Sequence, residues 1–148
     1  LDSDMVLDQP SLERGWKCLE TFSERLQDIP VSNIKIVGTA TLRLATNADV
    51  FIKKAEQILN HKLNVIDGEE EARQIYLGVA YTSANQGNSL VIDIGGASTE
   101  VIVGNDMSPI HLVSINMGCV TFKERFFADD TLSDQNFERA IEEATSLL

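Results

Sequence analysis

Residues 91–104 read VIDIGGASTEVIVG: an apolar run that ends in an acid, a pair of glycines with small hydroxyl residues, and a second apolar run. This pattern predicts two neighbouring strands, from Ser89 to Ile94 and from Thr99 to Gly104. A third run, from Ile110 to Asn116, makes a meander of antiparallel strands the simplest topology. Glycine weakens a strand and a buried acid loses hydration, so the turn suggests a use other than packing.

The first half of the chain alternates helices with short strands. Apolar residues at helical spacing predict helices that begin at a cap at Ser11, at a cap at Asp49 and near residue 69, and further helices over residues 121–127 and 133–148. The runs 34–39 and 63–68 are typical of short strands. This alternation favours parallel strands covered by helices.

The polar stretch SANQGNS, residues 83–89, is the best candidate for a hinge. It predicts a first lobe over residues 1–83 and a second lobe over residues 84–148. A chain of 148 residues with 43% hydrophobic and 24% charged residues suits one ordinary domain or two small lobes, and argues against disorder. No apolar run approaches the roughly 20 residues of a membrane span, and the first residues do not resemble a signal peptide.

The net charge of −11 makes nucleic acid an unsuitable partner, because no basic surface is available to replace phosphate counterions. A small anionic ligand stays open, since backbone amides, one arginine and a divalent cation can hold it. The two cysteines, Cys18 and Cys119, stand alone in apolar segments. We expect buried free thiols, which suit a reducing cytoplasm.

The Gly-Gly-Ala-Ser-Thr turn is the first candidate site. Two strands that meet there leave several backbone N–H groups close together. Without a Cβ at Gly95 or Gly96, an anion can approach these amides directly. Ser98 and Thr99 would add hydroxyl donors.

Two acids flank this turn. Asp93 stands at the exit of the first strand, where a carboxylate can hold a divalent cation directly or through water. Glu100 could fix a water or support the turn. The alternative is a glycine-rich hairpin in which Asp93 only caps the turn.

A second candidate is GEEEAR, residues 68–73. Acids in the first turn of a helix complement its dipole, which explains most of them without any function. The functional interpretation is that one carboxylate reaches into a cleft between the halves, where it orients and deprotonates an attacking water.

A third candidate is Arg43, which follows the strand that ends at Val37. An arginine just beyond the carboxyl end of a parallel strand can grip a phosphate through two hydrogen bonds. A surface salt bridge is equally consistent with the sequence.

The segment MGCVTFKERF, residues 117–126, opens a helix after a glycine. This glycine marks either a second anion-binding helix start or an ordinary connection from a strand to a helix. His61 and His111 have no partner at metal-ligand spacing, so no zinc site is expected.

In this order, GTATLRLA (38–45), GEEEAR (68–73), DIGGASTE (93–100) and MGCVTF (117–122) resemble the exopolyphosphatase and guanosine pentaphosphate phosphohydrolase family. That family shares the fold of actin, Hsp70 and sugar kinases, so the resemblance implies an α/β, partial actin-like (ribonuclease H-like) two-lobe chain with mixed sheets. Within the family, alanine at position 97 resembles the guanosine pentaphosphate branch more closely, because the exopolyphosphatase branch usually carries a third glycine there.

The resemblance also implies a reaction and roles. Glu71 matches the catalytic base that activates water, and Asp93 matches the residue that neighbours magnesium. The residues that match phosphate binding are Arg43, Gly95, Gly96, Ser98 and Glu100. The reaction would be Mg²⁺-dependent hydrolysis of guanosine pentaphosphate to guanosine tetraphosphate, or release of phosphate from polyphosphate. A homodimer of the parent protein is one option that the family leaves open.

One departure from the family pattern bears on activity. Family members begin with a phosphate loop of the form D-x-G-S-N-S, and no such stretch occurs here. We therefore expect a fragment that, by itself, hydrolyses substrate weakly or not at all. Two alternatives remain: a kinase of the same fold, and a non-catalytic module that senses nucleotides or phosphate.

Overall fold

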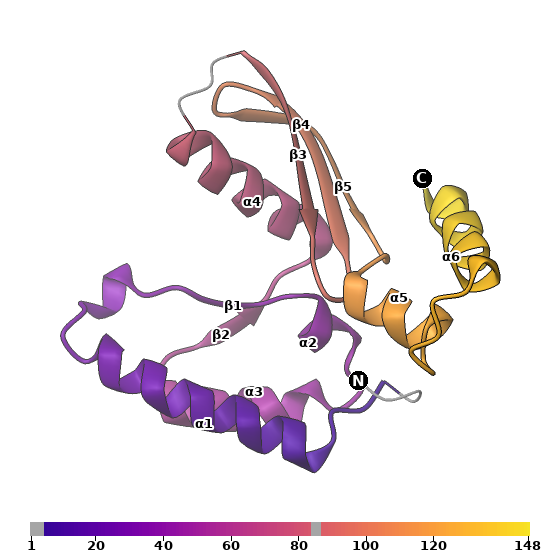
Figure 1. Cartoon of the computed structure of the whole chain (residues 1–148). Helices are drawn as coiled ribbons and strands as arrows, with labels where there is room; N and C mark the ends of the chain where they lie inside the picture. Colours follow the sequence, from indigo (N-terminus) through magenta and orange to yellow (C-terminus); the bar gives the residue numbers. More distant parts are fainter. Residues whose placement is uncertain (1–4, 84–86) are drawn as a thin grey trace. The chain divides into compact units, whose positions relative to one another are not determined.

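The chain forms an α/β structure with two separate sheets (Figure 1). The computed structural model describes residues 5–83 and 87–148. The chain divides into two compact units between Asp67 and Gly68. None of the helices in the described ranges is long and apolar enough to cross a lipid bilayer.

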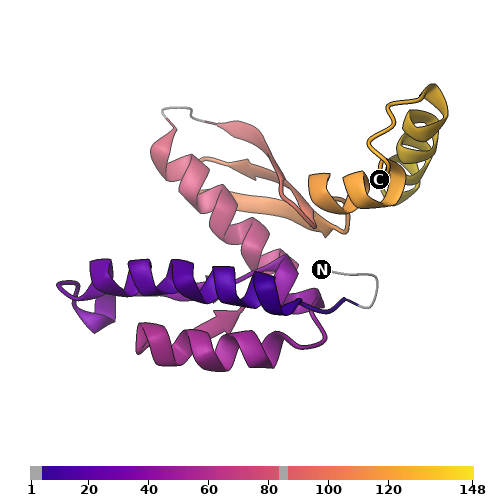
Figure 2. The same cartoon turned by 60° about the horizontal axis from the view of Figure 1, so that its bottom comes forward.

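The first unit combines one pair of strands with helices. Its elements in chain order are α1 (Gln9–Leu26), a 3₁₀ helix (Val31–Asn33), β1 (Ile36–Gly38), α2 (Ala40–Leu44), α3 (Ala48–Leu59) and β2 (Leu63–Val65). Strands β1 and β2 pair in parallel, with Ile36 opposite Leu63. Helix α1 lies beside α3 (Figures 1 and 2). The expected parallel pairing is confirmed in this unit, whereas the short helix α2 was not foreseen.

Trp16 holds α1 against α3. Its ring stacks on Phe51 with the centroids 6.2 Å apart, and its indole N–H donates to the Phe51 carbonyl at 3.2 Å. The cap of α1 is Asp8, not Ser11: the Asp8 carboxylate accepts from the Ser11 N–H at 2.8 Å. Hydrogen bonds from Ser11 hold the pKa of the Asp8 carboxyl below its usual value. The helix starts earlier than predicted because Pro10 fits the first turn, where its missing N–H costs nothing.

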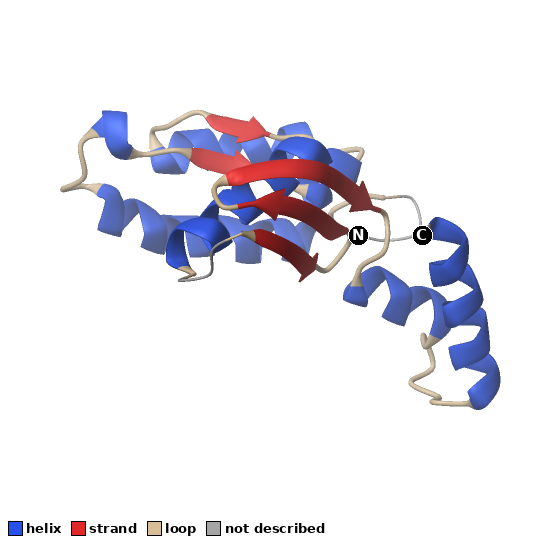
Figure 3. Ribbon diagram, turned by 90° about the horizontal axis from the view of Figure 1, so that it is seen from above, coloured by secondary structure: helices blue, strands red, loops and turns tan. Residues whose placement is uncertain are grey.

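The second unit is one helix on a sheet, followed by two helices. Its elements are α4 (Gly68–Thr82), β3 (Asn88–Ile94), β4 (Thr99–Asn105), β5 (Ser108–Ile115), α5 (Cys119–Phe126) and α6 (Asp134–Leu147). The sheet has the order β3-β4-β5 with antiparallel neighbours (Figure 3). The predicted meander is confirmed.

Helix α4 packs on one face of this sheet and forms its core. Ala72 and Tyr76 of α4 and Ile102 of β4 have no exposed surface. The Tyr76 hydroxyl lies 3.1 Å from Ser89 Oγ and donates to the Asp106 carbonyl at 3.0 Å. The sheet face under α4 is therefore closed.

The sequence placed the boundary between the two lobes at residue 83, and that lobe boundary stays a prediction. The compact units divide at Asp67 and Gly68 because α4 buries its apolar side against the second sheet. Part of the expected hinge, residues 84–86, lies outside the described residues. Which lobe of an actin-like protein each unit represents stays a prediction.

Some expected burial is wrong. Both cysteines are exposed and free. Cys18 lies two residues after the buried Trp16, which on a helix places it on nearly the opposite side.

Candidate functional site

The glycine-rich turn is the loop between β3 and β4. Ile94 and Thr99 pair directly across the ladder, so residues 95–98 make up the whole turn, which we call the glycine loop. The Gly95 N–H donates to the Ser98 carbonyl at 2.9 Å and closes the loop. The loop is therefore a defined turn held by the two strands.

Three successive amides of the glycine loop have no acceptor in the described part of the chain. Over residues 5–83 and 87–148, the N–H groups of Gly96, Ala97 and Ser98 make no hydrogen bond to the protein. Gly96 is exposed, whereas Ser98 is 4% exposed. Successive turn amides without internal partners are a common means of holding an anion. The loop can thus offer donors to phosphate oxygens.

The sequence suggested that both glycines are needed so that an anion can approach the loop amides, but the structure shows different surroundings for the two positions. A Cβ at Gly95 would lie 3.0 Å from the Ser98 carbonyl oxygen, tighter than ordinary packing allows. A Cβ at Gly96 would make an ordinary contact with Val120 at 3.5 Å. Both missing side chains would point within the loop or toward α5, so close packing accounts for Gly95 better than anion access does.

The two predicted carboxylates face one another on the α4 side of the sheet. Asp93 of β3 pairs directly with Glu100 of β4. Glu100 is only 1% exposed, and Ser114 of β5 donates from Oγ to Glu100 Oε1 at 2.7 Å. Like charges opposite one another on a sheet are destabilising, which points to a use for the pair beyond folding. No sequence signal pointed to Ser114, because this contact arises only when β5 pairs with β4.

The donor set at this strand pair suits Mg²⁺ bound partly through water. The described ranges hold no group of three or more His, Cys, Asp or Glu side chains that could ligate a metal alone. Mg²⁺ commonly binds through one or two carboxylates and keeps several waters, with substrate phosphates completing its shell. Asp93 is exposed and pairs with Glu100, so its carboxylate fits a ligand of this kind.

Glu71 lies in the first turn of α4, together with Glu69 and Glu70. Glu70 pairs with its own helix, through Arg73 at 3.5 Å and Gln74 at 2.7 Å. Glu71 is half-buried and precedes the fully buried Ala72. Figure 1 shows the start of α4 at the end of the sheet where β3 ends. The second unit therefore brings Glu71 to the end of the sheet that carries the glycine loop.

Arg43 lies in the first unit, on α2 just beyond β1. Its guanidinium Nη1 donates to the Ile66 carbonyl at 3.0 Å. This bond ties α2 to the segment that follows β2. The position beyond the carboxyl end of a parallel strand is the one predicted, and a role in phosphate binding stays a prediction.

The start of α5 is not a second anion site. The N–H of Cys119 donates to the Gly95 carbonyl at 2.9 Å, and those of Val120 and Thr121 donate to the Gly96 carbonyl at 2.9 and 3.2 Å. These helix amides are already used by the glycine loop, so the hypothesis of an anion there is wrong.

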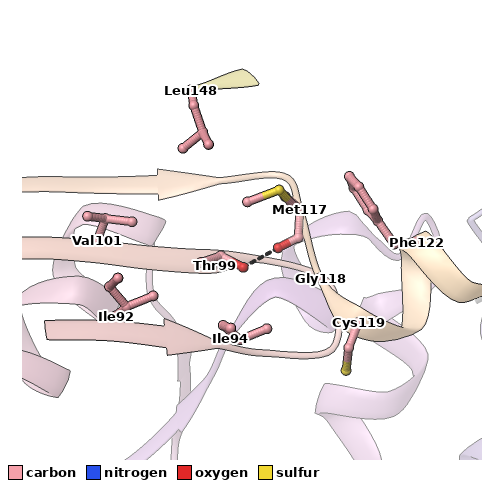
Figure 4. A pocket seen from close by; sticks show the side chains of 9 residues that line it. All are labelled: Ile92, Ile94, Thr99, Val101, Met117, Gly118, Cys119, Phe122 and Leu148. Atoms are coloured by element: carbon pink, nitrogen blue, oxygen red, sulfur yellow. Dashed lines mark hydrogen bonds between the residues drawn. The ribbon is translucent and has the colours of Figure 1, made fainter. Parts of the chain in front are cut away.

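Thr99 also differs from expectation. Its hydroxyl donates to the Met117 carbonyl and not toward an anion (Figure 4). It lines an apolar pocket of about 360 Å³ on the sheet face away from α4. The other residues in Figure 4 are Ile92, Ile94, Val101, Gly118, Cys119, Phe122 and Leu148. Thr99 therefore links β4 to the start of α5.

Comparisons with known proteins agree with this arrangement. The model of the Ppx/GppA phosphatase family matches residues 1–148. A guanosine-5'-triphosphate,3'-diphosphate pyrophosphatase of Pseudoalteromonas atlantica (strain T6c / ATCC BAA-1087) is 75% identical over the whole chain, which covers 29% of that protein. A protein of the same name from Pseudoalteromonas translucida (strain TAC 125) is 59% identical, and the chain covers 30% of it. The chain thus spans less than a third of the length of these relatives.

Solved structures extend the similarity to the fold. The Aquifex aeolicus PPX-GPPA enzyme matches 93% of this chain, and 46% of its own, with a TM-score of 0.73 and 29% identity. An exopolyphosphatase-like protein matches 96% of this chain, and 46% of its own, with a TM-score of 0.90 and 26% identity. The predicted α/β actin-like fold with mixed sheets is confirmed.

Proposed function

Because this chain belongs to the Ppx/GppA phosphatase family, we propose that the protein hydrolyses a terminal phosphoanhydride. Its substrates are guanosine pentaphosphate, which is converted to guanosine tetraphosphate, and polyphosphate, which releases phosphate. The observation that carries this proposal is the glycine loop, whose amides at Gly96, Ala97 and Ser98 have no acceptor within the described ranges. The names of the curated relatives support guanosine pentaphosphate as the main substrate.

In the proposed reaction, a water oxygen attacks the terminal phosphorus and Glu71 accepts one of its protons. The bond from phosphorus to the bridging oxygen breaks, and its electron pair leaves with the shortened phosphate chain. The amides of Gly96, Ala97 and Ser98 donate to the oxygens of the transferred group, where negative charge must be stabilised. Gly95 gives the loop its shape, and Arg43 binds the phosphate chain.

A divalent cation would complete this site. Mg²⁺, when bound, screens the negative charge of the phosphate oxygens. Asp93 would hold it, and Glu100 would help to orient its water ligands. The chain's own contribution is a carboxylate pair in fixed register, with Glu100 held by Ser114 at 2.7 Å.

We also propose that the protein acts in the cytoplasm on small anionic substrates. Its free cysteines suit a reducing compartment. Its net charge of −11 disfavours nucleic acids and anionic membrane surfaces as partners. A homodimer of the full protein is a further proposal that oligomeric-state measurement tests directly.

The decisive experiment is phosphate release by the full-length protein without any acceptor. We expect orthophosphate from guanosine pentaphosphate and from polyphosphate, with the higher kcat/KM for guanosine pentaphosphate. A kinase of the same fold requires an acceptor for the phosphoryl group. Absence of phosphate release unless an acceptor is added would contradict hydrolysis.

The substitution Asp93→Asn tests the metal assignment. We expect the Mg²⁺ concentration for half-maximal rate to rise on the order of tenfold, because the variant loses a negative ligand oxygen. The measurement is a Mg²⁺ titration of phosphate release at saturating substrate. Asp28→Asn, at an exposed position of the first unit, is the charge-matched control and should leave the titration unchanged. Equal Mg²⁺ dependence in the Asp93 variant and the wild type would contradict the assignment.

A further inference from the structure

We propose that the start of α5 is a clamp that aims the amides of the glycine loop, with Gly118 and Thr99 as its positioning residues. This inference rests on the proposed function, since it concerns how the loop presents donors to phosphate. The start of α5 would act through the glycine loop and would not itself donate a hydrogen bond to the phosphate. The argument depends on the carbonyl groups of the loop.

The contacts of the clamp are made by the first backbone amides of α5. The first N–H groups of a helix have no partner within the helix. In α5, those of Cys119, Val120 and Thr121 donate to the carbonyls of Gly95 and Gly96, at 2.9, 2.9 and 3.2 Å. Three hydrogen bonds therefore fix two successive carbonyls of the glycine loop.

Fixing these carbonyls also fixes the direction of two amides. In a planar trans peptide the C=O and the N–H point in opposite directions. The Gly95 carbonyl shares its peptide plane with the Gly96 N–H, and the Gly96 carbonyl shares its plane with the Ala97 N–H. Because both carbonyls point toward α5, both N–H groups must point away from it. These are two of the three loop amides that have no acceptor in the described part of the chain.

Gly118 lets the helix come this close. A Cβ at Gly118 would lie 2.3 Å from the Gly96 oxygen and 2.4 Å from the Ala97 nitrogen. Both are backbone atoms of one peptide plane, so no flexible side chain can give way. The φ of Gly118 is −131°, which any residue adopts. Glycine is required there by the close approach and not by backbone conformation.

Thr99 connects the end of the glycine loop to the segment just before α5. It is the first residue of β4 and follows the glycine loop directly. Its hydroxyl donates to the carbonyl of Met117, the residue before Gly118 (Figure 4). The loop is thus held through its own carbonyls at one side and through Thr99 at its exit.

The first test is Gly118→Ala in the full-length protein, with Gly78→Ala as the matched control. A Cβ at Gly78, on α4, meets nothing within 4 Å. We expect Gly118→Ala to weaken equilibrium binding of inorganic tripolyphosphate by roughly tenfold, equivalent to losing about one hydrogen bond. KM should rise with it, because the added methyl group turns the Gly96–Ala97 peptide. Gly78→Ala should bind tripolyphosphate as the wild type does.

The second test separates aiming from folding. Thr99→Val removes the hydroxyl, whereas Thr99→Ser keeps it. We expect weaker tripolyphosphate binding in the valine variant and recovery in the serine variant, at unchanged melting temperature. This pair of variants also tests the clamp if Gly118→Ala fails to fold.

Wild-type tripolyphosphate affinity in a folded Gly118→Ala variant, or in Thr99→Val, would overturn the clamp while leaving the proposed hydrolysis intact. Failure of the wild type to bind tripolyphosphate or to release phosphate would overturn both.

Discussion

Replacing Glu71 by Gln in the full-length protein is expected to lower kcat for guanosine pentaphosphate by roughly 10²–10⁴-fold, the usual contribution of a general base. Glutamine keeps the shape and hydrogen-bonding capacity of the side chain but cannot accept the proton of the attacking water. Substrate affinity should change little, because the proposed phosphate donors do not include the Glu71 carboxylate. Single-turnover kinetics with a separate binding measurement gives both quantities.

The matched control is Glu69→Gln, in the same helical turn. Glu69 is exposed, so its charge acts mainly on the helix dipole, worth a few tenths of a kcal/mol. We expect wild-type kcat in this variant. A non-catalytic sensor would give a different pattern, in which Glu71→Gln leaves both ligand binding and the low basal turnover unchanged. Retention of kcat within about tenfold would therefore rule out Glu71 as the base.

The features that the sequence predicted well are those set by local chemistry. A pair of glycines and a serine between two apolar runs predicted a tight turn, and the structure has that turn at residues 95–98. The alternation of helix and strand predicted the parallel pair β1–β2. The acids of GEEEAR lie in the first turn of α4, as predicted. The helix predicted from residue 133 is α6, which Ser133 caps by accepting from the Asn136 N–H at 3.2 Å.

The features that the sequence could not predict depend on contacts between distant segments. The bond from Ser114 to Glu100 needs the register of β5 on β4. The clamp at Gly118 needs α5 to approach the loop, and nothing in MGCVTF separates that role from an anion-binding helix start. The prediction that the cysteines are buried was wrong for a related reason, since apolar neighbours in sequence do not determine which side of a helix faces the core. The division into compact units at Asp67 and Gly68 was not foreseen either, because α4 packs on the sheet that follows it in the chain.

The core of the second unit depends most on Tyr76. Its side chain has no exposed surface, and a Cβ at Gly104 would lie 2.3 Å from its ring carbon Cζ, so β4 leaves the space that the ring fills. We expect Tyr76→Ala to lower the free energy of unfolding by about 3–5 kcal/mol, as for other buried aromatic side chains. The measurement is urea denaturation followed by circular dichroism. Because α4 also carries Glu71, phosphate release should fall with the loss of structure.

Tyr81 of the same helix provides the matched control. It is 83% exposed, so Tyr81→Ala should change the free energy of unfolding by no more than about 0.5 kcal/mol. Tyr76→Phe separates the ring from its hydroxyl, which contacts Ser89 at 3.1 Å and donates to the Asp106 carbonyl at 3.0 Å. Its expected cost is about 0.5–1.5 kcal/mol, the net value of a typical hydrogen bond. The order Tyr76→Ala, Tyr76→Phe, Tyr81→Ala, from most to least destabilising, follows from the burial of the Tyr76 ring and the hydrogen bond of its hydroxyl. An equal effect of the two alanine substitutions would mean that α4 does not pack on the sheet through Tyr76.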